Sequence, residues 1–237
     1  MDWASAAELQ QRLAGARKAG LIPDRLLFVE HPHTITLGRN SHRENLLAGE
    51  DALNRAGIAL HETNRGGDVT YHGPGQVVGY PILDLNDWKR DVHLYVRAVE
   101  QAIVDALGDF GIDAGRIQGL TGVWTGGAKI AAIGVHLSRW VTSHGFALNV
   151  NTDLSYFQYI VPCGLAMPVT SMRTLGIVAS RDEVTGRLSR HFARIFNRES
   201  VTYGRSDAAD GREYRRGNVD EVAEEGGRYS RAGRTAI

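Results

Sequence analysis

The sequence contains one cysteine, and the residues around it could support nucleophilic chemistry. Cys163 lies between a proline and a glycine in the stretch VPCGL, a combination typical of a turn. A structural cysteine is usually a small buried side chain inside a helix or strand. A cysteine in a turn is better exposed, and exposure is one condition of thiolate reactivity. This stretch alone leaves both a nucleophile and a structural cysteine open.

A lysine begins an apolar segment in GGAKIAAIGVHL. Lys129 follows two glycines and precedes IAAIG, so its amine could be desolvated. Desolvation favours the neutral amine, which is the form that accepts a proton in general base catalysis. The alternative is a solvated lysine at the end of a strand.

Residues 65–76, RGGDVTYHGPGQ, combine four glycines with a cation and a titratable ring. Arg65 offers a planar fork of donors, and His72 has a ring that ordinarily titrates near neutral pH. The stretch matches neither the phosphate loop G-x-x-x-x-G-K-[S/T] nor the dinucleotide pattern G-x-G-x-x-G. A flexible loop that lets a ligand lie against its backbone and a structural glycine turn between strands both fit.

The stretch HGFALNVN alternates large and small residues as a strand would. Alternation places His144, Phe146 and Leu148 on one face, and Gly145, Ala147 and Asn149 on the other. The small residues leave room for a narrow apolar ligand such as an acyl chain. A strand packed closely by a neighbouring helix is equally consistent.

Apolar periodicity and capping signals predict the elements that must position these stretches. Four helices are predicted. The first begins at the Ser5–Glu8 capping box and ends near Gly20, and the second is a short helix within 44–57. The third runs from Asp91 to Phe110, and the fourth begins at the Ser180–Glu183 capping box. Their buried stripes are Val92, Val96, Val99, Ile103 and Leu107 in the third, and Leu188, Phe192, Ile195 and Phe196 in the fourth. The predicted strands are 25–31, 34–39, 58–63, 76–85, 121–125, 128–138 and 141–150. Without a regular βαβ rhythm, this order favours an α+β fold with a mixed, largely antiparallel sheet.

Composition narrows the classes of function. The 237 residues are 43% hydrophobic and 23% charged, as in a globular protein, and the formal net charge of zero argues against a nucleic-acid binder. A single cysteine, no signal-peptide core and no eighteen-residue apolar run lead us to expect a cytoplasmic protein without a membrane span. We expect a catalytic domain over 1–202 and a disordered or loosely docked tail over 203–237, where glycine, arginine and acidic residues dominate.

In combination, these stretches resemble a known family. EHPHTITLGR, RGGDVTYHGPGQ, GGAKIAAIG, HGFALNVN and PCGL follow the order found in lipoyl(octanoyl) transferases, across about residues 9–176. The resemblance implies the fold of biotin and lipoate protein ligases. It also implies transfer of an octanoyl group from acyl carrier protein to a lysine of lipoyl domains, in 2-oxoacid dehydrogenase complexes and the glycine cleavage H protein. No cofactor and no metal are implied.

The resemblance also implies roles for individual residues. Cys163 would carry the acyl group as a thioester, and Lys129 would tune that cysteine and transfer protons. His144 is a candidate orienting group. The acyl site would be lined by Arg65, Gly66, Gly67, Asp68, Val69, Thr70, Tyr71, His72, Ala132, Ile133, Gly134, Gly145, Phe146 and Ala147. Two rivals are an ATP-dependent lipoate or biotin ligase of the same fold, which would not need Cys163, and a non-catalytic module that binds carrier protein or lipoyl domains.

Overall fold

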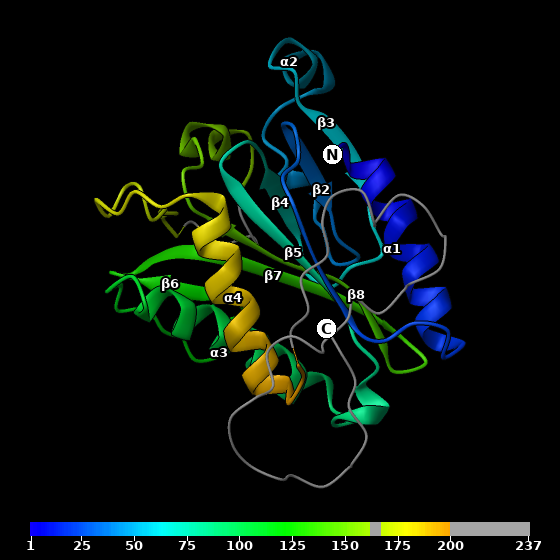
Figure 1. The fold of residues 1–237 in the computed structure, drawn as a ribbon. Coiled ribbons are helices and arrows are strands. Elements are labelled where there is room, and N and C mark those ends of the chain that lie inside the picture. The colour runs from blue at the N-terminus through cyan, green and yellow to red at the C-terminus, as the bar shows by residue number, and fades with distance from the viewer. Residues whose placement is uncertain (162–166, 200–237) are drawn as a thin grey trace, which may run out of the picture.

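The computed structural model describes residues 1–161 and 167–199 of the 237-residue chain. Within these residues, two β-sheets form the centre of the fold and helices lie against them (Figure 1). The predicted tail, residues 203–237, and the predicted nucleophile Cys163 lie outside the described residues.

The larger sheet has five antiparallel strands in the order β1-β5-β8-β7-β6. Its strands are β1 (Arg25–Val29), β5 (Gln76–Ile82), β6 (Val123–Thr125), β7 (Ala128–Ser138) and β8 (Val141–Asn149). In the smaller sheet, β2 (Thr34–Leu37) runs parallel to β3 (Ala59–Glu62) and antiparallel to β4 (Val69–His72). The predicted α+β class is confirmed, although the strands divide into two sheets.

Helices cover both faces of the larger sheet. α3 (Val92–Gly108) and α4 (Arg181–Phe196) pack together on one face, α1 (Trp3–Lys18) packs against β5 and β8 on the other, and the short α2 (Glu50–Arg55) contacts β3. Among the residues that the structure describes, short 3-10 helices at Arg43–Asn45, Leu85–Asp87 and Leu154–Tyr159 lie in connections. Phe146 of β8 joins the core under α3 and α4, whereas Ala147 packs with Ala6 of α1.

Two of the three predicted helix starts are confirmed. Asp91 caps α3 by accepting from the Leu94 backbone N–H at 3.0 Å, and Ser180 begins α4 with a complete capping box. The first predicted start is wrong, because Asp2 already caps α1 by accepting from the Ser5 N–H at 2.8 Å. α3 also ends at Gly108 rather than at Phe110.

The buried stripes differ from the prediction at their ends. In α3, Val92 is 40% exposed and the buried stripe begins one turn later, at Tyr95. In α4, Leu188, Phe192 and Phe196 are buried as predicted, while Ile195 is only partly buried against the same core. Apolar spacing identifies the helix but does not show where along its length the helix meets the sheet.

A buried carboxylate fixes the end of α1. Asp24 is fully buried and accepts from the Nε atoms of Arg17 at 2.6 Å and Arg198 at 2.9 Å, and from the Asp84 backbone N–H at 2.9 Å. Arg17 belongs to the last turn of α1, and Arg198 follows α4. One carboxylate therefore joins two helices to the end of β5 and so holds α1 in place.

Much of the predicted glycine loop is a strand. Residues Val69–His72 form β4, which is buried along its whole length and pairs with β2. The valine, threonine and tyrosine of this stretch are residue types that favour strands. Only the glycine pairs at either side form turns, so the predicted flexibility of residues 65–76 is wrong for their central part.

Candidate active site

Lys129 lies at the start of β7 with its side chain almost covered. The residue is 7% exposed, and its Nζ lies 5.1 Å from the centroid of the Trp124 ring. Its backbone N–H donates to Pro168 O at 2.8 Å, and its carbonyl accepts from the Thr170 N–H at 2.9 Å. Residues 168–170, which follow Cys163 closely in the chain, therefore run alongside Lys129.

A second buried carboxylate supports the lysine from α3. Glu100 is fully buried and accepts from Arg97 at 2.6 Å, Arg116 at 2.9 Å and the Gly122 N–H at 3.1 Å. A Cβ atom at Gly122 would lie 3.5 Å from Lys129 Cε and only 2.8 Å from a backbone oxygen of β7. Glycine at this position therefore lets the loop pack directly against the stem of the lysine.

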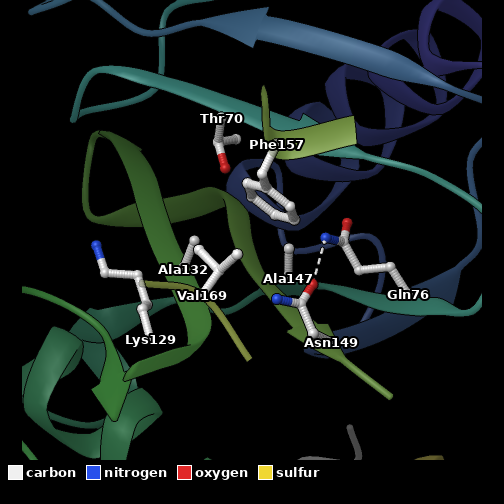
Figure 2. Close-up of a pocket in the computed structure, with 8 residues that line it drawn as sticks. All are labelled: Thr70, Gln76, Lys129, Ala132, Ala147, Asn149, Phe157 and Val169. Carbon is white, nitrogen blue, oxygen red and sulfur yellow. Dashed lines mark hydrogen bonds between the residues drawn. The ribbon is translucent and has the colours of Figure 1, made fainter. Parts of the chain in front are cut away.

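From Lys129, a narrow cavity leads over the face of β7 and β8 (Figure 2). Ala132 and Ala147 form its floor, and Phe157 projects into it from above. At the far side Gln76 donates to Asn149 Oδ1 at 3.0 Å, and Asn149 donates in turn to Thr170 O at 3.0 Å. This pair of hydrogen bonds links Thr170 to strands β8 and β5 of the sheet.

Thr70, Ala132 and Ala147 also line an adjoining hollow that we call the slot, which has a volume of about 500 Å³ counted out to its open mouth. Of the predicted acyl-site residues, the slot is lined by Arg65, Gly67, Asp68, Val69, Thr70, His72, Ala132, Ile133, Gly134, Gly145, Phe146 and Ala147. Residues from three motifs far apart in the sequence thus form one site.

Two predicted acyl-site residues lie elsewhere. Tyr71 is fully buried in the core of the smaller sheet, where its hydroxyl lies 2.7 Å from His33 Nδ1 and its ring stacks on Tyr156. Gly66 contributes backbone at the edge of the slot, with its N–H donating to Val135 O at 2.8 Å. Alternation along β4 explains why Tyr71 turns away from the neighbouring Thr70 and His72.

Arg65 is a buried residue in the wall of the slot. Its guanidinium donates to Thr36 O at 2.7 Å, Thr36 Oγ1 at 2.9 Å and Gly66 O at 3.1 Å. A Cβ atom at Gly134 would lie 3.0 Å from Arg65 Cδ, so glycine is needed for the arginine to cross β7. Arg65 is only 8% exposed, so it lies in the wall of the slot and not at its open mouth.

His72 is also in the interior rather than at the mouth. Its ring lies 2.9 Å from Gln76 Oε1 and 3.3 Å from Thr36 Oγ1. Burial lowers the pKa of His72 to about 3. The expected titration near neutral pH is therefore wrong, and the ring is neutral at pH 7.

His144 lines the slot together with Gly145, Phe146 and Ala147. Its backbone is left-handed, with φ of 55°, although it lies inside β8. Its Nε2 lies 2.6 Å from Asn64 Oδ1, and burial lowers the pKa of His144 to about 4.

Comparison with known proteins identifies this arrangement. The sequence model of the lipoyl protein ligase A/B catalytic domain matches residues 2–193. The chain belongs to this family. It is 74% identical over 201 residues to an octanoyltransferase of Solibacter usitatus, covering 85% of this chain and 91% of that protein.

A second curated relative and a solved structure extend the comparison, the latter for the fold alone. An octanoyltransferase of Koribacter versatilis is 50% identical, covering 84% of this chain and 82% of that protein. In fold, the chain resembles a bi-partite lipoate protein ligase of Thermoplasma acidophilum, with a TM-score of 0.59, 22% identity and 79% of each chain covered. The predicted family, fold and acyltransferase class are thereby confirmed.

Several residues of this lipoyl protein ligase A/B site were not predicted. Trp124 under Lys129 and Phe157 over the cavity carry no local signal of function in the sequence, whereas Thr36 beside Arg65 lies within the motif EHPHTITLGR. Gln76 and Asn149 end the two motifs GPGQ and HGFALN, and that position was the available signal.

Over 1–161 and 167–199, no group of three or more His, Cys, Asp or Glu could hold a metal ion, and no helix is long and apolar enough to cross a membrane.

Proposed function

We propose that this acyltransferase takes an octanoyl group from acyl carrier protein, holds it on Cys163 as a thioester, and transfers it to a lysine of a lipoyl domain in the cytoplasm. The observation that carries the proposal is the pairing of Lys129 with residues 168–170, at the head of a slot lined by the acyl-site motifs. In the sequence, Pro168 follows Cys163 by only five positions.

In the first half-reaction, the Cys163 thiolate attacks the acyl carbonyl, and the carrier thiol leaves with a proton from Lys129. An ammonium about 4 Å from a thiolate contributes on the order of 4 kcal/mol at an effective dielectric near 20. Because lowering a thiol pKa by two units requires only about 2.7 kcal/mol, Lys129 alone would suffice to favour the thiolate.

In the second half-reaction, the acceptor lysine attacks the thioester carbonyl, its proton passes to the now neutral Lys129, and the Cys163 thiolate leaves. One residue thus donates a proton in the first step and accepts one in the second. The exchange of one thioester for another is nearly balanced, and formation of the amide drives the sequence forward.

Intact-mass analysis after mixing with octanoyl carrier protein tests the proposal. The enzyme should gain one octanoyl group and lose it on addition of a lipoyl domain, while Cys163→Ser should gain nothing. A non-catalytic binding module would gain no adduct in either form. Transfer from free octanoate that requires ATP, with none from the carrier protein, would instead identify a ligase.

A further inference from the structure

A second hollow lies directly beyond the end of the slot, and only a thin wall separates the two. This outer hollow lies between α1 and the β7–β8 hairpin, and its volume, counted like that of the slot out to its open mouth, is about 1020 Å³. Its lining includes Ala7, Gln10 and Ala14 of α1, together with His136 and Ser143 of the hairpin. Trp3 and His144 line both hollows, so their side chains form the partition.

Several segments fix this partition. The His144 ring lies 2.6 Å from Asn64 Oδ1, and the His144 N–H donates to Gln10 Oε1 of α1 at 2.8 Å. The loop that carries Asn64 is held on β7 by the hydrogen bond from Gly66 N–H to Val135 O at 2.8 Å. These hydrogen bonds tie α1, the 64–66 loop, β7 and β8 together at one point.

Trp3 completes the partition from the first turn of α1. Its ring stacks on His61 of β3, with centroids 4.8 Å apart. The left-handed conformation of His144 directs its ring into the slot, at the end opposite Lys129. The wall is therefore built from aromatic rings held on two sides rather than from a mobile loop.

The slot has a defined length between Lys129 and the wall. Lys129 and Gly134 are five residues apart on β7, which corresponds to about 16 Å of strand. An extended eight-carbon chain is shorter than this span, so it fits between Lys129 and the wall. A longer chain would meet the rings of Trp3 and His144.

We propose that Trp3 and His144 form the end wall of the acyl site and so set its preference for chains of about eight carbons. The inference rests on the proposed function, because it assumes that the acyl carbonyl lies at Lys129 and that the chain extends from there along the slot. Opening the wall joins the slot to the outer hollow. A longer chain would find room there beside Ala7 and Ala14 of α1, among polar and charged side chains that include Lys18, Glu62 and Arg139.

The test measures transfer rates from carrier proteins loaded with six- to fourteen-carbon acyl groups. His144→Gly removes the ring and keeps the backbone conformation, since glycine adopts a positive φ readily. Trp3→Ala opens the wall from the other side. Ser143→Ala is the matched control, because Ser143 lines the outer hollow but not the slot. Thermal unfolding of each variant confirms that it is folded.

Both wall variants should raise the ratio of twelve-carbon to eight-carbon transfer by at least about tenfold, because one methylene in an apolar pocket is worth that much discrimination. The control should keep the wild-type ratio. An unchanged ratio in folded wall variants would refute the proposed end wall. A raised KM for the carrier protein at a constant ratio would also refute it, and would indicate that this end of the slot binds the arm of the carrier protein that holds the acyl group. Wild-type enzyme that transfers no octanoyl group from carrier protein would instead overturn the proposed function.

Discussion

Replacing Gly145 by alanine will destabilise the protein, although the change adds only one methyl group. A Cβ atom at this position would lie 2.1 Å from Gly79 O and 2.6 Å from Pro81 Cδ, both in β5. Cβ contacts below 3.0 Å are essentially never observed, so β5 and β8 would have to separate by about an ångström. Backbone atoms cannot rotate away as a flexible side chain can.

The expected cost lies at the upper end of the range for overpacking, about 3 kcal/mol. In a protein of this size, that corresponds to a fall in Tm of about 6–12 °C. Gly186→Ala is the matched control, because Gly186 lies inside α4 and an added methyl group there would have no neighbouring atom within 4 Å. The same substitution there should raise stability by about 0.5–1 kcal/mol.

Urea and thermal unfolding of both variants, followed by circular dichroism, provide the measurement. The two glycine-to-alanine changes should move the midpoint in opposite directions. A Gly145→Ala variant with the wild-type midpoint would show that β5 and β8 can separate freely at the slot floor. A destabilised Gly186→Ala variant would show that the difference does not arise from local packing.

Three further predictions concern buried charge and titration. The unfolding free energy will fall as the pH falls below about 6.5, because unfolded histidine then binds a proton that buried His72, with a pKa of about 3, does not. His72→Gln should remove about 2 kcal/mol of this loss at pH 5, and equal pH slopes in urea titrations would contradict it. Asp24→Ala should lower the unfolding free energy by about 3–5 kcal/mol, because it leaves buried arginines without their carboxylate. Glu100→Ala should lower it less, because the arginines paired with Asp24 are 9% and 7% exposed, whereas those paired with Glu100 are 46% and 33% exposed. The reverse order of urea midpoints would refute this. Lys129→Ala should lower transfer strongly while the protein stays folded, and near-wild-type turnover from pH 6 to 9 would remove Lys129 from the mechanism.

Local signals predicted most of the fold. The caps at Asp91 and Ser180 and the strand runs of β5, β7 and β8 depend on neighbours within a few residues, and these predictions are confirmed. The errors concern competition between signals. Asp2 precedes Ser5 and already satisfies its N–H, and the pairing of Val69–His72 with β2 overrides the flexibility of the surrounding glycines.

The site was predictable as a set of motifs but not as a geometry. The resemblance named the residues that line the slot, and twelve of the fourteen do so. Their protonation and depth were not predictable, because burial of His72 depends on how β4 and β5 come together. The left-handed backbone conformation of His144 was likewise not predictable, because no residue type in HGFALNVN indicates it.

The wall at the end of the slot shows why such features escape a reading of motifs. Trp3 lies outside every motif of the resemblance, and Asn64 immediately precedes RGGDVTYHGPGQ. Each has an ordinary role on its own, in a helix turn and in a loop. Only the fold places both against His144, where a hydrogen bond to Gln10 and one to Asn64 hold the residue across the slot. Chain-length preference would therefore depend on how α1 docks on the sheet, and the buried Asp24–Arg17 ion pair that fixes α1 would act on specificity from outside the site.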